Sequence, residues 1–139
     1  MSTEKNKAIV RRYQEALNTD KLDALDEVVA VDVRTPDMVP GLPPGLEGAK
    51  LIAKMTRAAW PDFQVRIDDL IAEDDRVAAR ITMTGTPRSE LFGIPATGKS
   101  FTMTGMYIVR IANGKIVEHR GLEDALGMLQ QLGVMPTLG

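Results

Sequence analysis

The residues best suited to chemistry gather in the last third of the chain, around a single histidine. His119 is the only histidine, and its side chain naturally titrates near neutral pH. Asp124 follows five positions later, with apolar residues such as Leu122 and Met128 nearby. Apolar surroundings raise the pKa of a carboxyl group and suit it to general acid–base work. An aspartate at this place can equally cap the helix that we expect to follow it.

Four further side chains have both a chemical and a structural interpretation. Tyr13 and Tyr107 can donate hydrogen bonds to a substrate oxygen, or they can be core residues whose hydroxyls find a partner. Arg80, in the middle of an alternating strand, can bind a substrate carboxylate, pair with Asp124 or stay solvated on a polar face. His119 can likewise face a ligand or be a half-exposed strand residue without a role.

Composition excludes several other kinds of site. The chain has no cysteine, so it cannot form a disulfide or use a thiol nucleophile. Because it also has a single histidine, we expect no zinc site or other metal site. The glycines match neither a dinucleotide-binding nor a phosphate-binding loop, and no nucleophile elbow occurs. A net charge of −2 gives no basic surface for nucleic acid.

The hydropathy pattern is that of a protein without a membrane segment. The first residues are polar and charged, unlike a signal peptide, and no stretch approaches the ~18 apolar residues of a membrane span. We therefore expect a cytoplasmic protein that does not bind membranes. A length of 139 residues fits a single domain over 1–139.

Apolar spacing changes from a helical period to a period of two near Phe63, and this change orders the elements. We expect helices at about 9–17, 20–29, 47–59 and 126–132, and strands at about 31–35, 63–72, 77–86, 100–111 and 115–120. Asp20 is the predicted cap of the second helix. Asn113-Gly114 is typical of a two-residue β-hairpin. This order predicts an α+β fold, with a curved antiparallel sheet wrapped by helices into a cone around an internal pocket.

Three strings of the sequence resemble the SnoaL-like polyketide cyclase family: Gly93–Gly98, Leu126–Gly133 and Trp60–Phe63. That family belongs to the nuclear-transport-factor-like superfamily of cystatin-like α+β cones. The resemblance implies a cofactor-free enzyme, either a polyketide cyclase that closes a ring by an intramolecular aldol reaction or a related isomerase. Its substrate would be a carbonyl-rich, apolar or aromatic small molecule.

The resemblance also implies roles for particular residues. Asp124 matches the aspartate that serves as general acid and base, and His119 would orient it or contact a substrate oxygen. Ketosteroid isomerases of the same superfamily hold an enolate with a tyrosine, matched by Tyr13, and an aspartate, replaced here by Tyr107. Asp37 falls near the general base of those isomerases.

Other matches to the superfamily are weaker. We expect Trp60 to contact the substrate as well. Related epoxide hydrolases carry Arg-x-Asp where this chain has Arg80-Ile81-Thr82, so that reaction is not expected.

Two other functions fit the same resemblance. One is a non-catalytic protein that binds a small molecule, and the other is an accessory hydroxylase, as in some relatives. A buried Asp124 would favour catalysis, whereas an exposed helix cap would favour binding. Relatives usually pair through the outer face of the sheet, so we expect a homodimer.

Overall fold

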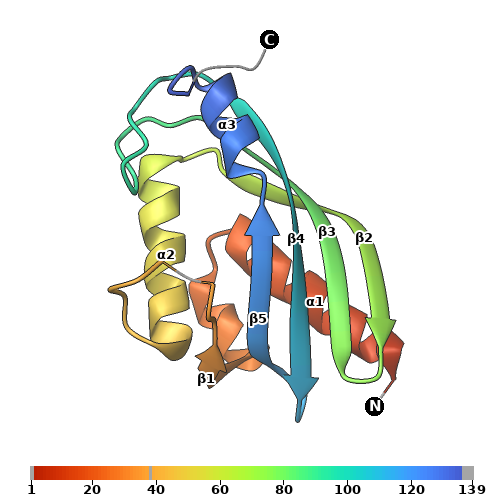
Figure 1. The fold of residues 1–139 in the computed structure, drawn as a ribbon. Coiled ribbons are helices and arrows are strands. Elements are labelled where there is room, and N and C mark those ends of the chain that lie inside the picture. Colours follow the sequence, from red (N-terminus) through yellow and green to blue (C-terminus); the bar gives the residue numbers. More distant parts are fainter. Residues whose placement is uncertain (1, 38, 136–139) are drawn as a thin grey trace.

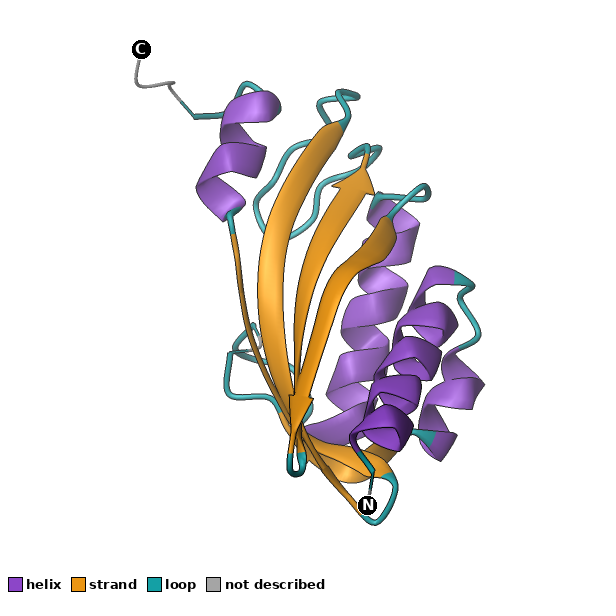
Figure 2. Cartoon of the chain, turned by 90° about the vertical axis from the view of Figure 1, so that its right-hand side faces the viewer, coloured by secondary structure: helices purple, strands orange, loops and turns teal. Residues whose placement is uncertain are grey.

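The computed structural model describes residues 2–37 and 39–135. A five-stranded curved sheet carries α1, η1 and α2 on one side (Figures 1 and 2). In chain order the elements are α1 (Thr3–Asn18), the 3-10 helix η1 (Leu22–Glu27), β1 (Val29–Arg34), α2 (Gly45–Ala59), β2 (Gln64–Glu73), β3 (Arg76–Gly85), β4 (Phe101–Ala112), β5 (Lys115–Glu123) and α3 (Ala125–Gln131). The predicted α+β class is confirmed. Among the described residues, none of the helices combines the length and the apolar character of a membrane-spanning segment.

The strand order is β1-β5-β4-β3-β2. Strands β2 to β5 form the predicted antiparallel meander, and β1 is added in parallel beside β5. The turn at Asn113-Gly114 has φ values of 52° and 76°, as a type I′ hairpin requires. This turn fixes the pairing of β4 with β5.

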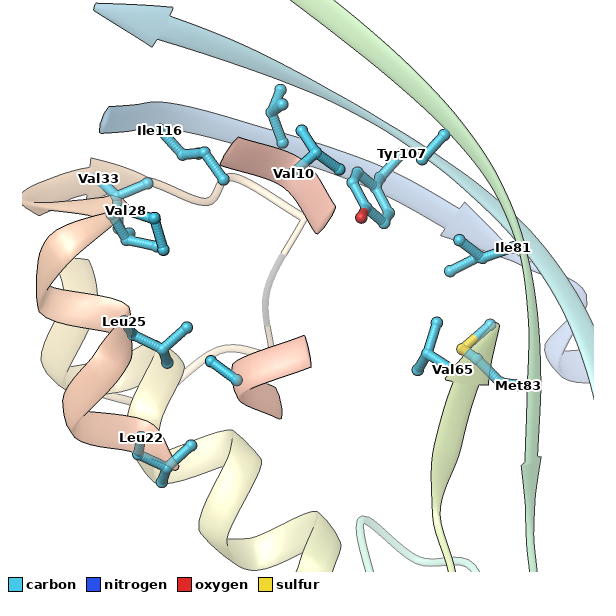
Figure 3. Close-up of a cluster of buried hydrophobic side chains, with 14 of the residues drawn as sticks. Val10, Leu22, Leu25, Val28, Val33, Val65, Ile81, Met83, Tyr107 and Ile116 are labelled. Atoms are coloured by element: carbon cyan, nitrogen blue, oxygen red, sulfur yellow. The ribbon is translucent and has the colours of Figure 1, made fainter. Parts of the chain in front are cut away.

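Alternate residues of β4 face the helices and form one wall of the core. Tyr107, Val109 and Ile111 are buried, whereas Met106 and Ile108 between them are exposed. Figure 3 shows Tyr107, Val10 and Met83 pointing into the same interior, between the sheet and the helices. The sheet therefore has an inner face toward α1 and α2 and an outer face away from them.

The second helix differs from its prediction. It is a short 3-10 helix. Its N-cap residue is Lys21, whose side chain makes no capping hydrogen bond. Asp20 has a φ of +57° and belongs instead to the end of α1, where its N–H donates to the carbonyl of Leu17. The prediction that Asp20 caps this helix was wrong, because the left-handed backbone that closes α1 occupies that residue.

Gly45, the first residue of α2, lies directly against strand β1. Gly45 has a φ of +74°, and a Cβ there would clash with the carbonyl oxygen of Val31. Only glycine tolerates both the positive φ and this contact, so α2 begins directly against β1.

Candidate active site

Three of the predicted site residues meet on the inner face of the sheet. Tyr13 comes from α1, Tyr107 from β4 and His119 from β5. The rings of Tyr107 and His119 stack at 4.7 Å between centroids, and Tyr13 lies 6.2 Å from Tyr107 and 6.0 Å from His119. We call these three residues the aromatic cluster.

The register of β4 with β5 explains why the aromatic cluster forms. Val109 pairs with His119 and Tyr107 pairs with Gly121, so the two rings share a face on adjacent strands. A Cβ at Gly121 would approach the Cβ of Tyr107 to 3.2 Å, closer than most side chains pack. The glycine therefore makes room for the stacked pair.

Burial keeps the aromatic cluster uncharged. Loss of solvent raises the pKa of Tyr13 to about 12. It also raises the pKa of Tyr107, with a smaller contribution from Tyr13, and it lowers the pKa of His119 below its ordinary value. At neutral pH the cluster holds two protonated hydroxyls and a neutral imidazole. Such groups can donate to or accept from a substrate without carrying a charge.

Gln14 extends the aromatic cluster and was not predicted from the sequence. Its side chain is buried, and its Oε1 accepts a hydrogen bond of 3.3 Å from the Tyr107 hydroxyl. A signal was present: Gln14 stands on the apolar stripe of α1, four residues after Val10 and three before Leu17. A polar residue at such a place needs a buried partner.

Asp37 is the predicted carboxylate that the fold brings to the aromatic cluster. Its Oδ2 accepts a hydrogen bond of 3.1 Å from the backbone N–H of Gly121 and lies 3.8 Å from Nε of Arg120. The charge of Asp37 also acts on His119, where it partly offsets the burial that lowers the pKa of the imidazole. Asp37 therefore ties its loop to β5 beside the cluster.

Asp124 caps α3. It is exposed, and its Oδ1 accepts a hydrogen bond of 3.0 Å from the backbone N–H of Gly127. Its own N–H donates to the carbonyl of Thr104, which fixes the start of α3 at the end of the sheet. These contacts are those of the helix-cap interpretation that the sequence left open. A part for Asp124 in proton transfer stays a prediction.

The structure does not bring Arg80 to the aromatic cluster. Arg80 lies on the outer face, opposite Met106, and pairs with Asp69 at 2.8 Å and with Asp68 at 3.7 Å. Its carboxylate partners are therefore on its own face of the sheet, and Asp124 is not among these ion pairs.

Trp60 lies at the end of α2, away from the aromatic cluster. It is buried, with its ring 5.7 Å from Phe63 and 5.2 Å from Phe101. Trp60 and the cluster thus belong to different ends of the inner face.

Hollows in the described surface border the core. One, of about 350 Å³, lies between α1 and β2 and is lined in part by Arg11, Gln14 and Asp68. Another, of about 640 Å³, runs along η1 to Lys54. Within the described residues no group of three or more His, Asp or Glu side chains could hold a metal ion. The internal pocket stays a prediction.

A fold does not by itself assign a function. Comparison with known proteins is more specific. The family model described as SnoaL-like polyketide cyclase matches residues 7–132, and the chain belongs to this family.

Two of the similar proteins are named as cyclases of methyl esters. The aklanonic acid methyl ester cyclase DnrD of Streptomyces peucetius is 31% identical over 131 residues, covering 90% of this chain and 88% of that protein. The nogalonic acid methyl ester cyclase of Streptomyces nogalater is 29% identical, covering 85% of this chain and 90% of that protein. The solved structure of TsrD from Streptomyces laurentii superposes with a TM-score of 0.89 at 27% identity, covering 97% of this chain and 99% of that one.

Proposed function

We propose that this protein is a cofactor-free polyketide cyclase that closes a ring by intramolecular aldol addition. The observation that carries the proposal is the aromatic cluster, three uncharged and largely desolvated polar groups on the inner face of a family cyclase fold. The substrate class is a flat, carbonyl-rich polyketide ester of the kind that names the relatives.

The reaction needs a base, a group that holds an oxyanion and an acid. The base takes a proton from the carbon beside one carbonyl, and the enolate carbon then forms a bond to a second carbonyl carbon. The oxygen of that second carbonyl becomes an alkoxide, and the protonated base returns the proton to it. Hydroxyls of Tyr13 and Tyr107 and the imidazole of His119 are suited to stabilise the developing oxyanion, because they are placed before the reaction and shielded from water.

Two aspartates compete for the role of base. The family resemblance assigns it to Asp124, which would have to release its cap bond to Gly127. The position beside His119 favours Asp37 instead. In the proposal Asp124 is the base, and Asp37 holds its loop and the substrate at β5.

Asp124→Asn and Asp37→Asn separate these assignments, with aklanonic acid methyl ester as the test substrate. Asparagine caps a helix about as well as aspartate, so Asp124→Asn should leave the melting temperature nearly unchanged. If Asp124 is the base, the kcat of the Asp124→Asn enzyme should be ~10²–10⁴-fold lower than that of the wild type. Retained turnover in Asp124→Asn, with loss in Asp37→Asn, would move the base to Asp37. A wild-type chain that converts neither this ester nor nogalonic acid methyl ester would contradict the cyclase proposal.

One observation favours a second function, that of a non-catalytic binding protein: Asp124 is an exposed cap. A binding protein would bind the ester and return it unchanged. Conversion that continues without molecular oxygen would in turn separate cyclisation from an accessory hydroxylase function.

The proposal includes a homodimer in the cytoplasm, paired through the outer face of the sheet. Met106 and Leu122 are directly opposite each other on β4 and β5, with side chains 55% and 80% exposed, and Ile108 beside them is 50% exposed. Apolar residues that adjoin on one exposed face commonly mark a protein interface. Sedimentation at micromolar concentration should give twice the mass of the chain, and a single species of monomer mass would contradict the dimer.

A further inference from the structure

Trp60 carries a buried polar group that the fold leaves without a partner. Its side chain is 6% exposed, and in the described part of the chain its Nε1 has no hydrogen-bond partner. The one comparable atom there is Oδ1 of Asn6, whose amide group already donates to the carbonyl of Asp74. Buried donors are nearly always paired in native proteins, because an unmade bond leaves the loss of hydration uncompensated.

Packing accounts for the ring of Trp60 but not for its N–H. The ring meets Phe63 and Phe101 at 5.7 Å and 5.2 Å, with tilted and edge-on geometry. A phenylalanine could make aromatic contacts of the same kind and would bury no unpaired donor. The packing of the ring therefore does not explain why this position has a side chain with an N–H.

The backbone carbonyl that precedes Trp60 is already hydrogen-bonded. The N–H groups of Arg88 and Ser89, in the connection between β3 and β4, both donate to the carbonyl of Ala59, the residue before Trp60. Figure 1 shows this connection beside the end of α2. Both hydrogen bonds occupy the carbonyl of Ala59, which is therefore not available as an acceptor for the indole.

The position of Trp60 relates it to the aromatic cluster. Phe101, its neighbour, begins the row of inner-face residues of β4, and Tyr107 lies six residues along the same row. Six residues of strand span about 20 Å. Between them lie Met83 and Met103, a buried cross-strand pair whose flexible thioethers can reshape around a flat ligand.

From these observations we propose that the Trp60 indole N–H donates a hydrogen bond to an oxygen substituent of the substrate. The oxygen belongs to the end of the substrate remote from the aromatic cluster. This inference rests on the proposed function and deepens it, since it requires an extended ring system with an oxygen acceptor at each end. Trp60 then sets how far the substrate enters, while the cluster serves the reacting carbonyls.

Trp60 is the only tryptophan, so a ¹⁵N-labelled chain has a single indole N–H resonance in its NMR spectrum. We expect titration with 1,8-dihydroxyanthraquinone, a flat tricycle with carbonyl oxygens, to move this resonance downfield and slow its exchange with solvent. If resonances of inner-face residues such as Met103 shift while the indole N–H does not, the inference is overturned. This measurement uses the wild-type chain and does not depend on a variant that folds.

Trp60→Phe gives the second test, with the matched control Phe63→Leu. Trp60→Phe keeps an aromatic ring and removes the N–H, so we expect the KM for aklanonic acid methyl ester to rise about 3–10-fold, with kcat little changed. The melting temperature of Trp60→Phe should fall less than that of Phe63→Leu, because Phe63→Leu loses ring contacts. The control Phe63→Leu should keep the response of the indole resonance to the anthraquinone. A Trp60→Phe enzyme with wild-type KM would refute the inference and leave the cyclase proposal standing. If the indole responds to the anthraquinone but the protein has no cyclase activity, the cyclase proposal is refuted and the inference about Trp60 stands.

Discussion

Tyr107 and Ile108 are consecutive residues of β4 and face opposite environments. Tyr107 is 4% exposed and stacks on His119, whereas Ile108 is 50% exposed on the outer face. The inner face carries few polar groups. Burial changes the pKa of each member of the aromatic cluster in the direction that favours its neutral form. The outer face carries charges that neutralise one another.

Asp68 illustrates the chemistry of the outer face. The hydrogen bond from Thr82, followed by that from Arg66, lowers the pKa of its carboxyl group. Arg66 lies 2.7 Å from this carboxylate, and Arg80 is shared between Asp68 and Asp69. These charges have partners and water, so nothing about them requires a substrate. We therefore propose the inner face as the place for chemistry, because its aromatic cluster is uncharged and largely buried.

The same charge placed on each face of β4 should have very different effects on stability. Val109→Asp buries a carboxylate where the native side chain is fully buried, and we expect a loss of about 3–5 kcal/mol in the free energy of unfolding. Ile108→Asp, one residue away, should change the stability of the monomer by no more than about 0.5 kcal/mol. Urea unfolding of the wild type and both variants, diluted until sedimentation finds monomers, measures the difference. Similar losses in the two variants would contradict the assignment of the faces.

Ile108→Asp also tests the proposed dimer. A charge in the centre of the outer apolar surface should shift the sedimenting species toward monomer mass. An unchanged dimer would place the interface elsewhere.

Removal of one hydroxyl tests the chemistry of the inner face. Tyr107→Phe keeps the ring against His119 and removes the hydroxyl, whose proton bonds to Gln14 in the free protein. In the proposal this proton turns from Gln14 to the oxyanion when substrate binds, so we expect kcat to fall by ~10²–10³-fold, as for loss of one oxyanion donor. Thr84→Val, on the outer face of β3, is the control and should keep wild-type kcat. Full activity of Tyr107→Phe on aklanonic acid methyl ester would remove Tyr107 from the site.

Much of this two-faced sheet could be predicted from local patterns. The alternation around Tyr107 and the Asn113-Gly114 turn together place the rings of β4 and β5 near each other, because a two-residue turn fixes the register of its strands. The register slips between Arg110 and Ile111, however, so Ile116 and not Val117 is the buried residue of β5. A bulge of this kind depends on tertiary packing and has no local signal here.

Contacts between distant residues were the part that the sequence did not reveal. Asp37 reaches Gly121 across 84 positions, through a loop whose proline content predicts irregular structure but not its path. The parallel pairing of β1 with β5 is equally non-local. Asp124 shows the remaining difficulty, since the same residue type at the same position suits a cap and a base, and only its surroundings distinguish the two.

Protonation of His119 should produce a smaller, pH-dependent effect on stability. Burial lowers the pKa of this imidazole in the folded protein, so the unfolded chain binds a proton first as the pH falls. Stability should therefore decrease as the pH falls from about 6.5 toward the folded pKa, and it should be fully present above about 6.5. His119→Gln should flatten this part of the profile of melting temperature against pH. A wild-type slope retained in the variant would assign the effect to other groups.

Arg80→Gln should have the smallest effect, and it tests the sequence-based expectation that Arg80 binds substrate. The guanidinium is about half exposed and pairs with Asp69, which is itself largely exposed. Exposed ion pairs contribute about 0–1 kcal/mol, because solvent screens them and ordering long side chains costs entropy. We therefore expect a stability loss within that range and an unchanged KM for the ester. A KM raised tenfold or more would mean that substrate reaches the outer face. The proposal that substrate binds only at the inner face of the sheet would then be wrong.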